Sequence, residues 1–385
     1  MDFKVVIWGA DDSNVLGVLR ALKDYGNSVL PLFQGRKSYI ASASRYCHKP
    51  FFVTSYEEGI ELLLKVGKTN SIKPFLITST DLVAEYVDKN KSRLEKYFYL
   101  SGTEESGKLS KILDKYQMGM LAERIGFTVP QSVTVTYEFK DNPVGYPCLV
   151  KPHKNVFDHS KEFKTKVCYD KEQLSELLKT VNRNSTFVLQ KYIEKDYDLL
   201  IYGSRLYSGE VVLAGSFIKD RWYKKADGSH GFLSPNIPAC IDINCIDDFL
   251  CSISYYGLFS FEFGVKNDEA FFYEVNLRND GTSHYFLQAG ANIPIIWLTQ
   301  FLNVDRSIYL NLHESEFIDE IYDYLNIKDG YVDQATWDKQ RLSSTVFKYY
   351  DKRDIKPYLI QIVEKKIKKL LLPIKPILLK ILENR

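Results

Sequence analysis

Residues 257–282 read GLFSFEFGVKNDEAFFYEVNLRNDGT and alternate apolar with polar or small side chains. This two-residue period is typical of β-strands, and it predicts two strands, 258–265 and 270–277, joined by a polar turn. Since alternate side chains of a strand share a face, Glu274 and Asn276 lie on the same face. The stretch therefore predicts a β-hairpin with a polar face.

The face occupied by Glu262 depends on the length of the turn. A two-residue loop pairs Glu262 with Tyr273 and separates the two carboxylates, whereas a three-residue loop, 267–269, pairs Glu262 with Glu274 on one face. Adjacent carboxylates repel and need a neutralising cation. The residues alone leave a second interpretation open, a solvated hairpin whose wet face is acidic.

In the second register the polar face suits a hard cation and an anion. The oxygens of Glu262, Glu274 and Asn276, together with phosphate oxygens, form a ligand set that Mg²⁺ accepts. Arg278 lies one step further along the face, and its guanidinium can bind an anionic group through two hydrogen bonds.

The spacing F-E262-F, twelve residues to Glu274, and then E-V-N-L-R resembles the metal-binding signature of the ATP-grasp superfamily. The closest likeness is to the biotin carboxylase and carbamoyl-phosphate synthetase type. The resemblance implies that Glu262, Glu274 and Asn276 bind Mg²⁺ (or Mn²⁺) bridging the ATP phosphates. It also implies a catalytic role for Arg278, which would orient a substrate carboxylate or stabilise an acyl-phosphate.

Two lysines are candidate phosphate ligands. Lys115 follows Asp114 inside the helical pattern 109–121, where an exposed charge pair is the alternative. Lys151 precedes Pro152 at a strand end, which holds it extended and gives its stem a defined direction; an ordinary edge lysine is the alternative. The resemblance implies that both lysines contact ATP phosphate and that Lys151 takes part in catalysis by neutralising phosphate charge.

The strand 186–193 is similar to the adenine-binding hinge of the same superfamily. The resemblance implies that the Gln190 side chain meets the adenine amino group and that the backbone of Lys191 and Ile193 reads the ring edge. Asp198, or Glu194, would meet the ribose hydroxyls. One feature departs from the superfamily: the loop 153–166 contains no glycine, although relatives cover the phosphates with a glycine-rich loop.

Composition limits the classes of protein that the 385 residues can form. The 51 basic and 49 acidic residues nearly balance, which argues against nucleic acid as a partner. Six scattered cysteines show no disulfide or zinc spacing and are typical of a reducing compartment. The N-terminus lacks signal-peptide features and no apolar run is long enough to span a bilayer. We therefore expect a cytoplasmic protein.

The chain is predicted to be an α/β protein, α+β in part. Short buried strands at 4–9, 28–32 and 75–78 alternate with helical patterns at 14–25 and 57–65, which predicts a Rossmann-like domain. Its first turn lacks the G-x-G-x-x-G pattern, so dinucleotide binding is not expected. We expect three parts: a Rossmann-like domain (1–104), an ATP-grasp domain of two α+β subdomains (105–303, lid about 128–190) and a helical, basic C-terminal extension (304–385).

The C-terminal stretch 355–385 carries eight basic and two acidic residues, with apolar residues at helical spacing. A basic amphipathic helix of this kind can lie on an anionic membrane surface. The alternative is a helix docked on the body of the protein with its lysines reaching into solvent. The first interpretation predicts peripheral contact with the inner face of the membrane.

These observations favour an ATP- and Mg²⁺-dependent ligase that activates a carboxylate as an acyl-phosphate and joins it to an amine. Its substrates would be small or lipid-linked, as in an amino-acid ligase of cell-wall or capsule precursor synthesis, and the chain could act as a homodimer. A non-catalytic ATP-binding module recruited to the membrane surface is the alternative.

Overall fold

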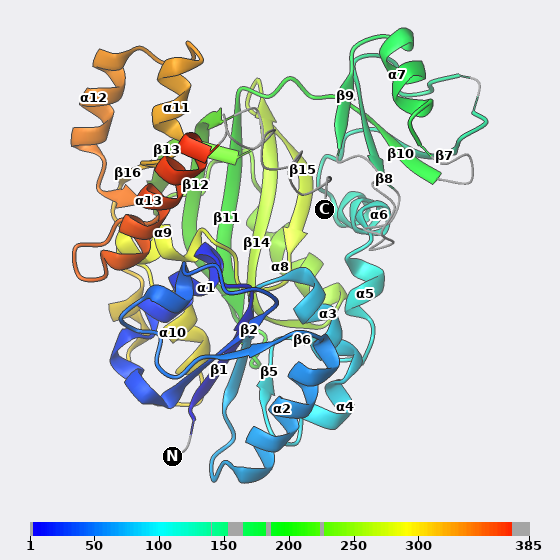
Figure 1. Cartoon of the computed structure of the whole chain (residues 1–385). Coiled ribbons are helices and arrows are strands. Elements are labelled where there is room, and N and C mark those ends of the chain that lie inside the picture. The colour runs from blue at the N-terminus through cyan, green and yellow to red at the C-terminus, as the bar shows by residue number, and fades with distance from the viewer. Residues whose placement is uncertain (1–2, 140, 153–164, 182–185, 224–226, 372–385) are drawn as a thin grey trace, which may run out of the picture.

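The computed structural model describes residues 3–139, 141–152, 165–181, 186–223 and 227–371. In these residues the strands form three principal sheets: a parallel sheet at the N-terminus, a large sheet at the centre and a small sheet at one side (Figure 1). The fold class predicted above, α/β with α+β parts, is confirmed.

The N-terminal sheet is parallel and has the strand order β3-β2-β1-β4-β5. Its strands are β1 (Val5–Gly9), β2 (Val29–Gln34), β3 (Phe51–Val53), β4 (Phe75–Thr78) and β5 (Tyr99–Leu100). β1 and β4 are buried along their whole length, as expected of parallel strands covered on both faces. Helices α1 (Ser13–Ala21), α2 (Tyr56–Thr69), α3 (Asp81–Lys89) and α4 (Lys91–Leu94) accompany the sheet.

The first helix is shorter than the apolar pattern 14–25 predicted. Asp12 caps its N-terminus by accepting hydrogen bonds from the backbone amides of Asn14 and Val15. After Ala21 the chain forms a 3₁₀ segment, η1 (Lys23–Ser28), in which Gly26 has a φ of 53°. The α-helical part thus ends at Ala21, and 3₁₀ turns take up the rest of the pattern.

Close packing on the outer face of this sheet depends on Gly59 of α2. A Cβ atom on Gly59 would lie 2.1 Å from Cζ2 of Trp8, whose side chain is fully buried. The glycine therefore lets α2 approach the centre of the sheet. A second 3₁₀ segment, η2 (Ala41–Ala43), connects β2 to β3.

Asp114 separates two helices rather than lying inside one. α5 (Leu109–Ile112) ends before it, and Asp114 then caps α6 (Lys115–Ile125) through the amides of Tyr116 and Gln117. Lys115 is thus the first residue of α6. The small antiparallel sheet follows, with the order β7-β10-β8-β9. It consists of β7 (Ser132–Thr136), β8 (Cys148–Pro152), β9 (Lys166–Cys168) and β10 (Thr186–Lys191), with helix α7 (Lys171–Leu178).

The large sheet has the order β15-β14-β11-β12-β13-β16-β17, and the short β6 (Gly102–Thr103) pairs with β14. Its central strands are β11 (Tyr197–Arg205), β12 (Val211–Tyr223), β13 (Asp227–Ser234), β14 (Tyr255–Lys266) and β15 (Glu269–Asn276). Helix α8 (Ile243–Ser252) precedes β14, and α9 (Ser283–Gln288) and α10 (Ile293–Leu298) follow β15. β12 runs to Tyr223, so Lys219 and Arg221 lie within a strand.

The C-terminal extension, predicted to be helical, contains two short strands besides its helices. Between 3₁₀ segment η3 (Arg306–Tyr309) and the C-terminal helices, β16 (Ser315–Ile318) pairs with β13, and β17 (Val346–Phe347) pairs with β16. The helices of this segment are α11 (Asp323–Lys328), α12 (Gln334–Ser343) and α13 (Lys356–Leu371). β16 and β17 are strands because they pair with neighbouring strands of the central sheet. Each is too short to show a clear period in the sequence.

Within the described residues, no helix is long and apolar enough to cross a membrane. The C-terminal part of the predicted membrane-contact stretch, 372–385, lies outside the described residues, as does most of the glycine-free loop, 153–164.

Candidate functional site

The hairpin of β14 and β15 settles the question of register through a β-bulge. Its turn is the two-residue loop Asn267-Asp268, and both residues have positive φ, 49° and 59°, as in the tight turns that join antiparallel strands. The pairing runs from Lys266↔Glu269 to Phe263↔Phe272 and then shifts by one residue, so that Glu262 faces Glu274. A bulge increases local twist and re-aims side chains, and here it places both carboxylates on one face.

The residue inserted at the bulge is Tyr273, and Gly264 makes room for it. A Cβ atom on Gly264 would lie 2.0 Å from the Tyr273 hydroxyl. Only glycine allows the tyrosine ring to lie this close across the strand. The pairing of the two carboxylates therefore depends on the bulge, and the bulge packs against a glycine.

Each carboxylate has its own lysine. Lys115 Nζ lies 2.9 Å from Glu274 Oε2, and Lys219 Nζ lies 3.8 Å from Glu262 Oε2. Burial raises the pKa of Glu262, and repulsion from Glu274 adds to this effect although Lys219 opposes it. For Glu274 burial also favours the neutral form, but Lys115 outweighs it and lowers the pKa. The pair thus has one ionised carboxylate and one that needs more positive charge nearby, such as a divalent cation supplies.

Asn276 presents its amide nitrogen, not its oxygen, to Glu262. The nitrogen lies 3.1 Å from Glu262 Oε1 and 3.2 Å from Ser260 Oγ, while the oxygen accepts a 2.9 Å hydrogen bond from Arg278. To ligate a cation beside the carboxylates, the amide would have to rotate by half a turn. This rotation exchanges the positions of its oxygen and nitrogen. The role of Asn276 as a metal ligand stays a prediction.

Arg278 joins the hairpin to the N-terminal sheet. Its Nε donates a 2.7 Å hydrogen bond to Asp81, the first residue of α3, and its Nη1 donates to the carbonyl of Asn279 at 3.1 Å. Asp280 lies 3.6 Å from Nη1. The guanidinium is thus held in one orientation by α3 on one side and by the chain that follows β15 on the other. Such fixing is what a group that positions a substrate requires.

Lys151 of the small sheet lies within electrostatic range of Glu274. Its Nζ donates a 2.7 Å hydrogen bond to Gln190 Oε1, and Gln190 Nε2 donates to Ser132 Oγ at 2.9 Å. Burial, with a contribution from the positive charge of Lys115, lowers the pKa of Lys151 to about 8. An ammonium that lacks a full counter-charge is a suitable partner for a phosphate.

The predicted adenine hinge has one backbone donor available. The amide of Lys191 is bonded to the carbonyl of Gln131 at 2.8 Å, and the carbonyl of Ile193 accepts from the amide of Lys195 at 2.9 Å. No acceptor among the described residues binds the amide of Ile193. The Gln190 oxygen faces Lys151, so Gln190 serves the lysine in this arrangement, and its contact with adenine stays a prediction.

Asp198, the predicted ribose ligand, is held by two donors. Lys195 Nζ and Trp222 Nε1 each lie 2.5 Å from its carboxylate. Glu194, the alternative, is exposed.

The structure adds Lys219 and Asp81 to the site, whereas the nearby Arg221 lies outside it. Arg221 makes two hydrogen bonds, of 2.8 and 2.6 Å, to Asp323 of α11, so it binds the C-terminal segment. Lys219, two residues earlier, lies beside Glu262 instead. Residues two apart share a face in a regular strand, but the register of β12 shifts between Lys219 and Arg221 and again between Arg221 and Trp222, which allows the two side chains to diverge. Asp81 had a signal in the sequence: it follows the buried strand β4, and the carboxyl ends of parallel strands are where ligands gather.

Among the described residues, no group of three or more His, Cys, Asp or Glu side chains is placed to hold a metal ion. The pair Glu262–Glu274 supplies two carboxylates, fewer than such a group contains. Such a set fits Mg²⁺, which commonly takes one or two carboxylates and completes its shell with phosphate oxygens and water.

A scan against protein-family models and a search of curated proteins found no match to this chain. Solved structures do match. The ADP complex of an N5-carboxyaminoimidazole ribonucleotide synthetase is 14% identical, with a TM-score of 0.64 over 86% of this chain and 85% of that one. An L-amino acid ligase from Bacillus licheniformis is 11% identical, with a TM-score of 0.60 over 81% and 77% of the two chains.

A third match is the biotin carboxylase domain of the 2-oxoglutarate carboxylase from Hydrogenobacter thermophilus, in complex with MgADP, ADP and bicarbonate. It is 16% identical, with a TM-score of 0.57 over 82% of this chain and 74% of that one. Sequence identities this low show a shared fold and no more. The chain has the ATP-grasp fold, as the signature of the hairpin predicted.

Proposed function

We propose that this chain is an ATP- and Mg²⁺-dependent ligase that activates a carboxylate as an acyl-phosphate and joins it to an amine. The observation that carries the proposal is the pairing of Glu262 with Glu274 across the bulge, with Lys115 and Lys219 against them. A solvated acidic hairpin would not bring lysines from α6 and β12 onto its face. The likeness in fold to ligases supports the same conclusion.

In this proposal the lysines receive the phosphates of ATP. Lys115 keeps its charge, since the nearby Glu274 carboxylate outweighs burial and raises its pKa. Lys151 supplies a second charge from the small sheet, beside the hinge whose Ile193 amide would read the adenine edge. Lys191 and Asp198 would complete the nucleotide contacts through the hinge backbone and the ribose hydroxyls.

Mg²⁺ bound by Glu262 and Glu274, with Asn276 after rotation of its amide, would supply charge that neutralises the phosphate oxygens; Mn²⁺ could replace it. Arg278 would hold the substrate carboxylate. A carboxylate oxygen then bonds to the γ-phosphorus as the bond to ADP breaks. The amine nitrogen next bonds to the acyl carbon, phosphate leaves, and the amine proton passes to water. Positioning and electrostatics are the chain's contribution to these steps.

The test is release of ADP from Mg-ATP by the purified chain, screened against pools of carboxylates and amines. Glu274→Gln removes one charge of the pair, and we expect it to abolish acceptor-dependent ADP release. Glu269→Gln is the matched control, because Glu269 is exposed at the start of the same strand. Release that survives Glu274→Gln would overturn the proposal. Binding of ATP without turnover in any pool would favour the non-catalytic module.

The proposal extends to the substrate, the place of action, the oligomeric state and the division of the chain. The basic stretch that begins with α13 is consistent with a lipid-linked substrate and with an amino-acid ligase of cell-wall or capsule precursor synthesis, working in the cytoplasm or at the inner face of the membrane. We also propose that two copies of the chain form a homodimer. We also propose the division of the chain into parts 1–104, 105–303 and 304–385, although β16 and β17 extend the central sheet.

A further inference from the structure

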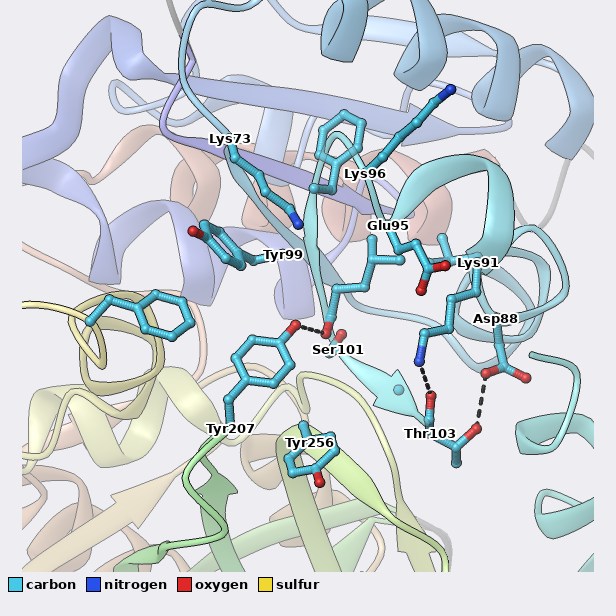
Figure 2. A pocket seen from close by; sticks show the side chains of 15 residues that line it. Lys73, Asp88, Lys91, Glu95, Lys96, Tyr99, Ser101, Thr103, Tyr207 and Tyr256 are labelled. Atoms are coloured by element: carbon cyan, nitrogen blue, oxygen red, sulfur yellow. Dashed lines mark hydrogen bonds between the residues drawn. The ribbon is translucent and has the colours of Figure 1, made fainter. Parts of the chain in front are cut away.

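A second concave site lies away from the residues described above. It is a cleft of about 500 Å³ between strand β5, the end of α3 and the central sheet (Figure 2). None of the residues that line it belongs to the proposed ATP site. Its volume is in the range of pockets that bind small molecules.

One wall of the cleft is aromatic and comes from both sheets. Tyr99 belongs to β5, Tyr207 follows β11, Tyr256 belongs to β14 and Phe301 follows α10. The rings of Tyr207 and Phe301 are stacked, 5.8 Å apart and 12° from parallel, and Tyr99 lies 4.8 Å from Phe301. The ring of Phe301 is 55% exposed. A large ring left half in water beside a cleft is a surface on which a flat ligand can stack.

The wall has a fixed orientation before any ligand arrives. The Tyr207 hydroxyl donates a 2.6 Å hydrogen bond to the carbonyl of Leu100, shown in Figure 2. The ring of Tyr256 packs 5.4 Å from that of Tyr207 on the side of the central sheet. A preformed wall loses little side-chain freedom on binding.

A lysine without a carboxylate partner stands over this wall. The Lys73 ammonium lies 4.8 Å from the centre of the Tyr99 ring, and in Figure 2 it points toward the cleft. No ion pair to Lys73 is present in the described part of the chain. Lys91, by contrast, donates to the carbonyls of Thr103 and Glu104 at 2.7 and 2.6 Å. Lys96, the third lysine of the cleft, lies over the Tyr97 ring at 4.8 Å and points away from the aromatic wall in Figure 2. Lys73 is therefore the lysine of the cleft that stands at the aromatic wall.

The acidic residues of the cleft do not cancel this charge at the aromatic wall. Asp88 accepts hydrogen bonds from the Thr103 hydroxyl at 3.1 Å and from the Leu109 amide at 2.9 Å. Glu95 is exposed and lies on the side of Lys91, away from Tyr99 (Figure 2). Lys73 and the aromatic groups thus lie together at one end of the cleft, and the acidic groups lie at the other end beside Lys91.

We propose that this cleft binds a planar aromatic ring that carries a carboxylate or phosphate, with the ring stacked on Phe301 and Tyr207 and the anion at Lys73. Stacking on an aromatic side chain and pairing with a surface ammonium are the two contributions to affinity. The site is independent of the ligase reaction proposed above.

The experiment is calorimetric titration of the full chain with 1-naphthyl phosphate in the presence of saturating Mg-ATP, so that the nucleotide site is filled. We expect binding of 1-naphthyl phosphate, weaker binding of 1-naphthol, which lacks the charge, and none of glycerol phosphate, which lacks the ring. Phe301→Ala should weaken binding about 10-fold, and Lys73→Ala should weaken it about 5-fold. Both side chains are exposed, so the variants should fold.

Two neighbouring positions provide matched controls. Leu302 is 59% exposed next to Phe301 but does not line the cleft, and Lys68 is an exposed lysine at the end of α2. Leu302→Ala and Lys68→Ala should bind the probe as the unmodified chain does. Absence of binding, equal binding by Phe301→Ala, or loss of binding when Mg-ATP is added would each overturn the proposal.

Discussion

Lys151 makes nucleotide binding depend on pH in a way that can be calculated. Its pKa is lowered to about 8 by burial and by the positive charge of Lys115. Below this pH the side chain is an ammonium that can pair with phosphate, and above it the side chain must take up a proton before it can do so. Affinity for Mg-ADP should therefore fall as pH rises through 8.

The size of the effect follows from the fraction of protonated lysine. Raising the pH from 7.5 to 9.5 lowers that fraction about 25-fold for a pKa of 8, so the dissociation constant should rise about 25-fold. Lys115 should stay charged over this range because its pKa is raised. A rise in pH does not weaken the folded state through this lysine: the unfolded chain binds more protons between pH 8 and 10.5, so the cost of burying the Lys151 ammonium is relieved as pH rises through this range.

The assay is titration with Mg-ADP at half-unit steps of pH, with circular dichroism to verify the fold at each step. Lys151→Arg is the matched control, because a guanidinium keeps its proton throughout and should bind with a nearly constant affinity. If the unmodified chain and Lys151→Arg show the same dependence on pH, then Lys151 is not the titrating group at the phosphates.

Three further predictions concern the domain contact, the bulge and the core. Asp81→Asn removes the charge that holds Arg278 and should lower the rate of ADP release about 10-fold or more with little change in ADP affinity; an unchanged rate would contradict the positioning role. Gly264→Ala should cost about 1–3 kcal/mol in urea unfolding because its methyl group meets Tyr273. Adding Tyr273→Ala should make the loss smaller than the sum of the single losses, and strict additivity would count against the clash. Leu250→Ala should cost about 2–5 kcal/mol, measured in the same way, because its side chain is fully buried against β14 and β15; a loss below 1 kcal/mol would contradict the packing.

The sequence correctly predicted the strands whose hydrophobic pattern is strong. Strands of buried apolar residues at β1 and β4 and the alternating strands β14 and β15 were all found close to their predicted bounds. The helix predicted at 14–25 ends at Ala21 and gives way to 3₁₀ turns, a change of hydrogen bonding that a hydrophobic pattern does not reveal. β16 and β17 escaped prediction because pairing with the central sheet, and not their own few residues, makes them strands.

The candidate site divides in the same way. The resemblance of residue types and spacing to a known signature singled out Glu262, Glu274 and the two candidate phosphate lysines, because residue types and their order along the chain are local properties of the sequence. The bulge at Tyr273 was beyond prediction, since both loop lengths were open and the shift depends on how a ring packs over Gly264. Asp81 and Arg278 are 197 positions apart in the chain, and their contact exists only because two sheets pack together.

By itself, the sequence determined the alternation of the hairpin, the acidic and amide groups of its polar face and the presence of an N-terminal parallel sheet. These depend on the period of side chains along a strand and on which residues can be buried. Only the tertiary structure decided that the carboxylates face each other, that Lys219 and not Arg221 joins them, and that an aromatic cleft forms with Lys73 at its edge. These features bring together side chains from distant segments, and their relative positions depend on packing between sheets, which no local pattern encodes.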